Sequence, residues 1–350
     1  MPQTVRIGLI GAGFMGQKAH LENYVTIPEC KVVALAEGRE ATARQVADKF
    51  GIAHVYPDHR AMLAAEELDA VVAVMPYRLY HAVVPEVLQA GLPLLTEKPM
   101  CLRTDTARGL AELADRQGVV YYVGYMKRSL PATQEAVKTL RQWQASGEVG
   151  SMRYLRALMP PGNWTFDIER PVSGPDAPVS YEGEAPEAPP EHLSPEMQRK
   201  YDSFVNYYIH QVNLIRYLLG EDWHVTYVDP TEAVLAGESE SGVPVVLEMQ
   251  GYGLKNGWEE SYRVVFEAGK VDLSVPAPLA RQRGGELDVF SSATQTSIRP
   301  VLPPHWCFLE QARHFVRCLR GEDTPRVSVW DAVKDLEVAD EYVRLLEKRR

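Results

Sequence analysis

The hydrophobic pattern of the chain changes near residue 125. Before that point, short apolar runs alternate with segments whose apolar residues recur every three or four positions, which predicts strands alternating with helices. Strands are expected at 5–10, 32–36, 70–74, 94–95 and 119–123, and helices near 16–26, 40–50, 60–65, 81–90 and 104–117. This alternation predicts a doubly wound parallel sheet of the α/β class, with its ligand site at the carboxyl ends of the strands.

Beyond residue 125 the elements follow a different order. A helix is expected at 132–146, a strand at 152–158 and a second helix at 203–219, which begins at Asp202 or Ser203 and ends at Gly220. Strands then follow one another at 225–228, 233–236, 245–250, 262–266, 270–275 and 287–290, before two helices at 308–320 and 330–348. Strands without intervening helices predict an antiparallel sheet. We therefore expect one domain over 1–124 and a second, α+β domain over 125–350.

A proline-rich arm, 160–200, interrupts the second region. It contains nine prolines between residues 160 and 195, together with many acidic residues. Proline at this density prevents regular helices and ladders. Long loops in compact domains are usually functional or disordered, so two interpretations stay open. The arm is either a solvated excursion or an ordered lid over the active site or a neighbouring subunit.

Composition and charge exclude several classes of function. The chain has 350 residues and a formal net charge of −10, which disfavours binding to nucleic acids and anionic membranes. It lacks an uninterrupted apolar run of about 18 residues, the length that a membrane-spanning helix needs. Its four cysteines are scattered without a metal-binding or disulfide-like spacing. With the first strand starting almost at once, a signal peptide is not expected, and a reducing cytoplasm is the simplest location.

A glycine-rich run follows the first predicted strand directly and reads Gly11-Ala12-Gly13-Phe14-Met15-Gly16. In such a run the first glycine permits a tight turn, the second lets the backbone approach a pyrophosphate, and the third allows close helix packing. Glu37 ends the second strand, where a carboxylate binds the adenosine ribose hydroxyls and repels a 2′-phosphate. Arg39 could instead bind that phosphate, so the sequence favours NAD without excluding NADP. A tight turn without a ligand is the simpler alternative.

Two further groups of residues suggest chemistry. Lys98 follows the fifth strand and precedes Pro99, which restricts its backbone, so its ammonium could hydrogen-bond a substrate hydroxyl at the ligand edge. On the predicted helix 203–219, the four residues Asn206, His210, Asn213 and Tyr217 share one face. A histidine among amides suits a general acid or base, because histidine titrates near neutrality. A surface lysine and a structural histidine are the alternatives.

These motifs, in this order, resemble those of the Gfo/Idh/MocA oxidoreductases, which include glucose–fructose oxidoreductase and inositol dehydrogenase. The glycine run, Glu37 and Glu97-Lys98-Pro99 carry the resemblance, and the run 75–81, which contains Pro76 and His81, is similar to the family's T-P-N-x-x-H loop. Segment 204–220 resembles the helix with the D-x-x-x-H pattern, and 308–346 resembles the closing helices. The resemblance therefore covers nearly the whole chain.

The resemblance implies a Rossmann domain, a second domain with an open, mostly antiparallel sheet, and a homodimer or homotetramer formed through that sheet. The last helix could pack back on the first domain. It also implies hydride transfer between nicotinamide and a carbinol carbon of a sugar, cyclitol or related polyol, with Lys98 and His210 as the catalytic residues. The implied dinucleotide-binding residues are Gly11, Gly13, Phe14, Met15, Gly16, Glu37, Arg39, Pro76, His81, Glu97 and Lys98. The candidate substrate-binding residues are Tyr125, Lys127, Arg128, Trp164, Asn206, His210 and Asn213.

Departures from the family pattern leave alternatives open. Asn206 stands where the family often has aspartate, and an amide cannot accept a proton. Tyr77 replaces the usual asparagine of the loop, and the glycine-rich lead-in to the catalytic helix is missing. One alternative is an NAD-dependent enzyme that cleaves glycosides by transient oxidation and elimination. A dinucleotide sensor without catalysis is another, although the presence of both Lys98 and His210 argues against it.

Overall fold

The computed structural model describes residues 4–165, 168–176, 185–249 and 254–348. The chain divides into two compact units of similar size. The first comprises Met1–Tyr125, Glu169–Leu193 and Phe308–Val333, and the second comprises Met126–Ile168, Ser194–Cys307 and Lys334–Arg350. Part of the proline-rich arm therefore belongs to the same unit as the glycine-rich run.

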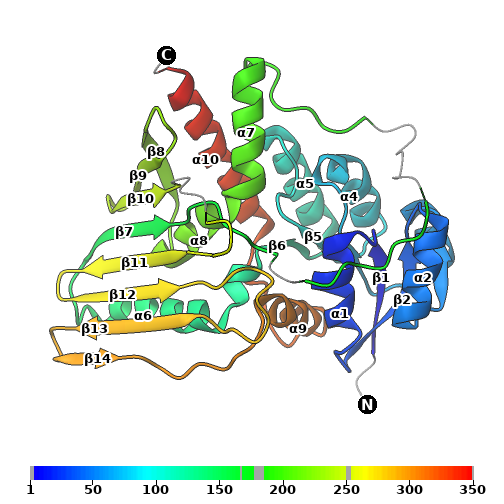
Figure 1. The fold of residues 1–350 in the computed structure, drawn as a ribbon, viewed down its shortest axis with the longest axis horizontal. Helices are drawn as coiled ribbons and strands as arrows, with labels where there is room; N and C mark the ends of the chain where they lie inside the picture. Colours follow the sequence, from blue (N-terminus) through cyan, green and yellow to red (C-terminus); the bar gives the residue numbers. More distant parts are fainter. Residues whose placement is uncertain (1–3, 166–167, 177–184, 250–253, 349–350) are drawn as a thin grey trace. The chain divides into compact units, whose positions relative to one another are not determined.

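The first unit contains a six-stranded parallel sheet, as the sequence predicts (Figure 1). Its strands are β1 Val5–Ile10, β2 Cys30–Ala36, β3 His54–Tyr56, β4 Ala70–Ala73, β5 Leu94–Glu97 and β6 Tyr121–Gly124. Their order is β3-β2-β1-β4-β5-β6, so the direction of winding reverses between β1 and β4. In such sheets the ligand binds at this switch point, outside the carboxyl ends of the strands.

The helices of the first unit fall near their predicted positions. A π-helical turn, Gly16–Leu21, leads into α1 Glu22–Tyr24, and the others are α2 Glu40–Phe50, α3 His59–Ala65, α4 Tyr80–Gln89 and α5 Thr104–Gln117. Helices α4 and α5 pack side by side (Figure 1). Gly118 ends α5 in the left-handed conformation, which glycine adopts without steric cost. Strands β1, β4 and β5 form the core, because Ile7, Val72 and Leu94 are fully buried.

The second unit contains an eight-stranded, mostly antiparallel sheet. Its strands are β7 Met152–Leu158, β8 Trp223–Val228, β9 Val234–Ser239, β10 Pro244–Glu248, β11 Ser261–Phe266, β12 Gly269–Ser274, β13 Glu286–Ser291 and β14 Thr296–Ile298. They lie in the order β14-β13-β12-β11-β7-β10-β9-β8, and β7 and β10 form the parallel pair among these described strands. Helix α6, Pro131–Ser146, packs against β12 and β13 (Figure 1).

The prediction of one helix over 203–219 is wrong in two respects: the region contains two helices, and the first of them begins earlier, at Pro195. The structure has two helices, α7 Pro195–Tyr207 and α8 Ile209–Leu219, which meet at Tyr208. Ser194 begins α7, because its hydroxyl accepts the Met197 N–H at 3.3 Å. The following Pro195 is favourable at the first helical position, so the proline that suggested an irregular segment in fact starts a helix.

The closing helices are α9 Cys307–Leu319 and α10 Val329–Glu347. Within the described residues, none of the helices has the length and apolarity needed to cross a membrane. The same residues hold no cluster of three or more histidine, cysteine or acidic side chains that could bind a metal ion.

Candidate active site

The glycine-rich loop after β1 is shaped by steric limits at Gly11 and Gly16. Gly11 has φ +88°, and a Cβ there would lie 2.3 Å from the Val74 carbonyl oxygen. A Cβ on Gly16 would lie 2.4 Å from the Gly11 carbonyl oxygen. A Cβ on Gly13 would have no heavy atom within 4 Å. The loop is therefore held closely against β4, whereas its backbone at Gly13 borders open space where a ligand can approach.

Glu37 connects this loop to the end of β2. It is 7% exposed, and its Oε2 accepts the Ala12 N–H at 2.8 Å. Arg39 donates to the same carboxylate from Nε at 2.9 Å and from Nη2 at 2.8 Å. Burial raises the pKa of Glu37, but the hydrogen bonds from Arg39 and the two backbone N–H groups outweigh it, and the net shift is downward. Glu37 would repel the 2′-phosphate of NADP and Arg39 could bind it, and the structure pairs the two side chains with each other.

Glu97 and its neighbours fix the backbone directly before Lys98. The Glu97 carboxylate hydrogen-bonds with His20 Nε2 at 2.8 Å, and the Glu97 N–H donates to the Tyr80 hydroxyl at 3.2 Å. That hydroxyl donates in turn to the Ala73 carbonyl at 3.0 Å, which ties the ends of β4 and β5 together. Lys98 is half-buried, and the Lys98–Pro99 peptide bond is cis. The candidate catalytic lysine therefore follows an anchored strand end.

The loop after β4 carries the two other candidate dinucleotide-binding residues. Pro76 precedes a single 3₁₀ turn, Tyr77–Leu79, and His81 is the second residue of α4. Its Nδ1 atom is buried and makes no hydrogen bond with the part of the chain that the structure describes. Because this loop leaves β4 at its carboxyl end, it belongs to the same edge of the sheet as the glycine-rich loop.

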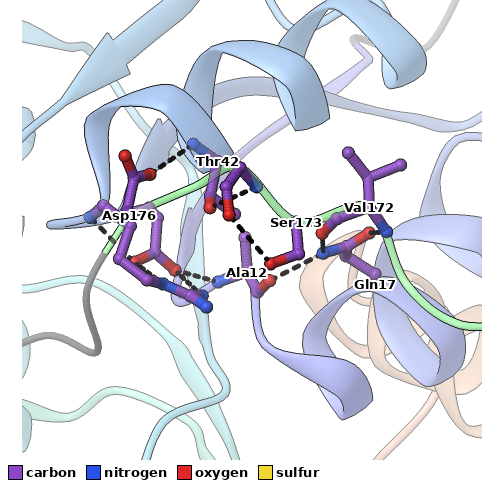
Figure 2. Close-up of polar contacts among 9 residues, drawn as sticks. Ala12, Gln17, Thr42, Val172, Ser173 and Asp176 are labelled. Carbon is purple, nitrogen blue, oxygen red and sulfur yellow. Dashed lines mark hydrogen bonds and ion pairs between the residues drawn. The ribbon is translucent and has the colours of Figure 1, made fainter.

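The proline-rich arm crosses this edge near the first two strands. Gln17, which directly follows the glycine run, donates from Nε2 to the Val172 carbonyl at 2.8 Å and accepts the Val172 N–H at 2.9 Å. The same Nε2 donates to the Ala12 carbonyl at 2.8 Å. Thr42 in α2 accepts the Gly174 N–H at its hydroxyl, at 2.9 Å (Figure 2). The described part of the arm is therefore fastened to two helices that begin at the ligand edge.

The arm is also fastened at the loops that follow β4 and β5. Glu187 is buried, and its Oε2 accepts the Leu102 N–H at 2.6 Å. The Glu187 N–H donates to the Arg78 carbonyl, and Arg78 Nη1 donates back to the Glu187 carbonyl, both at 2.8 Å. Four loops at the carboxyl edge therefore touch the arm or lead into helices that touch it. These hydrogen bonds hold the described part of the arm against the loops and helices at this edge.

In the second unit, Lys127 lies in a buried ion pair. It is 3% exposed, and its Nζ donates to both carboxylate oxygens of Glu260 at 2.7 Å. Glu260 also accepts from Gln211 Nε2 at 2.9 Å and from the Tyr262 hydroxyl at 2.6 Å. Burial lowers the pKa of Lys127 although Glu260 opposes this, and burial together with Glu260 raises the pKa of Tyr262. The sequence gives no local signal for Glu260.

Arg128 and Asn213 belong to a second buried network. Arg128 Nε donates to Asn213 Oδ1 at 2.7 Å, and Asn213 Nδ2 donates to Asp335 Oδ2 at 2.7 Å. Arg216 forms an ion pair with the other oxygen of Asp335. The Arg128 guanidinium also lies over the Tyr217 ring, 4.5 Å from its centre. These side chains therefore bind one another inside the unit.

The remaining candidates differ in exposure. His210 is half-buried in the first turn of α8, whereas Asn206 is exposed in the last turn of α7, so Tyr208 divides the predicted single stripe. Trp164 is 38% exposed. Tyr125 is buried and belongs to the first unit with Lys98, whereas His210 belongs to the second.

Comparison with known proteins gives consistent matches. Residues 5–125 match the model of an oxidoreductase family with an NAD-binding Rossmann fold. The chain is 24% identical to scyllo-inositol 2-dehydrogenase (NAD(+)) of Bacillus subtilis strain 168, over 97% of this chain and 93% of that protein. It is 31% identical to D-glucoside 3-dehydrogenase of Escherichia coli K12, over 49% of this chain and 48% of that protein.

A solved structure extends the likeness to the whole fold. Levoglucosan dehydrogenase, in a complex with NADH and levoglucosan, aligns with a TM-score of 0.74 and covers 99% of this chain and 98% of that one. At 18% identity, this likeness concerns the fold alone.

Proposed function

We propose that the chain is an oxidoreductase of the Gfo/Idh/MocA type, which transfers hydride between a nicotinamide dinucleotide and a carbinol carbon of a sugar, cyclitol or related polyol. The proposal rests mainly on the hydrogen bond between the glycine-rich loop and Glu37. Ala12 donates to Glu37 at 2.8 Å, while Gly13 borders open space beside the start of a helix. This arrangement suits a pyrophosphate and the ribose next to it.

The residues at the carboxyl edge fit a dinucleotide. The run 11–16 would hold the pyrophosphate, Glu37 the adenosine ribose, and Pro76, His81 and Glu97 the nicotinamide end. Bound there, the dinucleotide supplies the acceptor or donor of the hydride. We propose NAD as the preferred form, because Glu37 is ionised and buried at the ribose position and would repel a 2′-phosphate.

The chain's own residues would manage the proton and the charge. During oxidation His210 accepts the substrate's hydroxyl proton at a ring nitrogen, and the Lys98 ammonium stabilises the negative charge that develops on that oxygen. Glu97 supports this role, because its bonds to His20 and Tyr80 hold the backbone that presents Lys98. Asn206 cannot accept the proton, so no aspartate-dependent step is assigned to α7.

We assign the substrate-binding candidates different roles according to burial. Trp164 and Asn206 are exposed and are proposed to contact the polyol directly. Lys127, Arg128 and Asn213 are buried and bound to neighbouring side chains, so we propose that they fix the shape of the substrate-binding surface. The relatives' names, which refer to inositol and a glucoside, support a cyclic polyol as the substrate class.

An NAD-dependent glycoside-cleaving enzyme is the second candidate. Such an enzyme would oxidise a sugar hydroxyl to a ketone, eliminate the aglycone, add water across the resulting double bond, and return the hydride to the ketone. The oxidised dinucleotide would thus be regenerated in every turnover. The arm's contacts with Gln17, Thr42 and Leu102 favour this candidate. They hold the arm beside the loops that would bind the dinucleotide, and this would slow its release.

One screen tests both candidates. Cyclitols, free sugars and aryl glycosides are incubated with NAD or NADP, and reduced nicotinamide and released aglycone are measured in the same reaction. Reduced nicotinamide in proportion to a ketone product supports the dehydrogenase. Release of aglycone without accumulation of reduced nicotinamide supports the glycoside-cleaving enzyme. Absence of both products with every substrate would refute the proposed function.

A further inference from the structure

Asp176 reaches the adenosine side of the proposed dinucleotide site from a distant part of the sequence. Its Oδ2 accepts the backbone N–H of Thr42 at 2.7 Å, although 134 positions separate the two residues. Figure 2 shows Asp176 beside Thr42, with the arm running on through Ser173 to Val172, which hydrogen-bonds with Gln17. The arm therefore brings a carboxylate to the start of α2.

The contact between the arm and α2 is closely packed. Gln17 and Thr42 are each 1% exposed, and both use their side chains to hold the arm's backbone. Gly174 makes the approach possible, because a Cβ on it would lie 2.9 Å from Thr42 N and 3.0 Å from Ala41 Cβ. A side chain at residue 174 would force the arm away from α2. The hydrogen bonds of Gln17 and Thr42 and the small size of Gly174 thus fix the position of Asp176.

The place that Asp176 occupies matters for the choice of dinucleotide. Helix α2 has no side-chain cap of its own, and its Ncap residue is Arg39, the partner of Glu37. In this fold an acidic residue such as Glu37 binds the ribose 2′-hydroxyl, and an Arg nearby accommodates a 2′-phosphate. Helix α2 begins at Glu40, three residues after Glu37. A 2′-phosphate there would need N–H donors and positive charge, and the Asp176 carboxylate already takes the Thr42 N–H.

We propose that Asp176 is a specificity-determining residue, which together with Glu37 selects NAD against NADP. The inference rests on the proposed function, since it requires that the edge of the first sheet binds a nicotinamide dinucleotide. Two carboxylates then face the 2′ position, one from β2 and one from the arm. The Glu37 carboxylate binds Arg39, and the Asp176 carboxylate accepts the Thr42 N–H at the start of α2.

The test is a binding measurement on Asp176→Asn with NAD⁺ and NADP⁺, by isothermal titration calorimetry. Asparagine keeps an oxygen that can accept the Thr42 N–H, so the arm stays fastened while the charge is removed. We expect the affinity for NADP⁺ to rise about tenfold and that for NAD⁺ to change less than about twofold. Glu191→Gln is the matched control, because Glu191 lies on the same arm and is exposed, and it should leave both affinities unchanged.

A second variant separates the charge from the placement of the arm. Gly174→Ala should displace Asp176 while keeping its charge, and should shift the NADP⁺ to NAD⁺ ratio in the same direction as Asp176→Asn. An unchanged ratio in Asp176→Asn, or an equal change for both dinucleotides, would overturn the inference. If the wild-type protein binds neither dinucleotide, the proposed function itself fails, so the two failures are distinguishable.

Discussion

The backbone N–H of Ala12, in the glycine-rich loop, donates to the Glu37 carboxylate at the end of β2, 2.8 Å away. This bond joins the two sequence features that suggest a dinucleotide, which are 25 positions apart in the chain. It also makes the shape of the loop depend on an ionised side chain. Glu37 is therefore expected to affect stability as well as binding.

The lowered pKa of Glu37 predicts a pH-dependent contribution to stability. The folded state binds a proton on Glu37 less readily than the unfolded state, so the carboxylate stabilises the fold above its ordinary value near 4.5. This stability is lost as the pH falls through the folded pKa. Glu37→Gln should therefore be less stable than the wild type at pH 7, and the difference should shrink toward pH 3. Urea unfolding of both proteins across this range measures it, and a constant difference would contradict the assignment.

The lowered pKa of His314 predicts a second pH dependence of stability, over a different pH range. Burial lowers its pKa to about 4, and its Nδ1 pairs with the Tyr122 hydroxyl at 3.2 Å. The unfolded chain takes up the proton near pH 6.5, so stability is full above that pH and falls between about 6.5 and 4. The shift corresponds to roughly 3 kcal/mol.

His314→Phe should flatten the pH dependence of the unfolding free energy over this window, whatever its effect at pH 7. His224→Gln replaces an exposed histidine and is the control. If the unfolding free energy changed with pH equally in His314→Phe and the wild type, His314 would not remain neutral in the fold.

The Lys127–Glu260 pair predicts a large cost when one partner is removed. Lys127→Met leaves a buried carboxylate without its cation, which is expected to cost about 3–5 kcal/mol of unfolding free energy. Replacing both residues by Met should cost less than the single change, because no buried charge remains. Lys138→Met breaks an exposed pair with Glu135 and should cost under about 1 kcal/mol. Chemical denaturation of the four proteins checks this, and equal losses in the two lysine variants would refute it.

Lys98 predicts a separation of binding from turnover. Lys98→Met should lower kcat by about 10²–10⁴-fold, while the affinity for NAD changes little. Lys31→Met, which removes an exposed cation on β2, is the control and should keep full activity. Steady-state kinetics and calorimetry on the same preparations supply both numbers. Unchanged turnover in Lys98→Met would remove Lys98 from the mechanism.

Local patterns in the sequence predicted most of the fold. Strand β1 and helix α2 have the predicted bounds, because an uninterrupted apolar run and a helical repeat mark them clearly. Strand β3, His54–Tyr56, was missed because three residues are too few to show a strand pattern in the sequence. The start of α7 was missed because its cap and first residue, Ser194-Pro195, also end a proline-rich segment.

The site could be predicted only where its residues are close in sequence or match a motif. The glycine run and Glu37 are of this kind, but the hydrogen bond between them was not predicted from the sequence. The partners His20 of Glu97 and Glu260 of Lys127 lie 77 and 133 positions away and carry no motif. The contact of Gln17 with Val172 spans 155 positions, and only folding reveals it.

Hydride transfer between a nicotinamide dinucleotide and a cyclic polyol would move the hydrogen of the carbinol carbon onto the nicotinamide ring. The most direct measurement uses polyols deuterated at the carbinol carbon, incubated with NAD and the purified protein, with the reduced nicotinamide analysed by mass spectrometry. We expect deuterium to appear in the nicotinamide with the wild-type protein, whereas Lys98→Met should bind NAD and transfer deuterium far more slowly. Binding of NAD without any transfer of deuterium from sugars, cyclitols or glycosides would contradict the proposed hydride transfer.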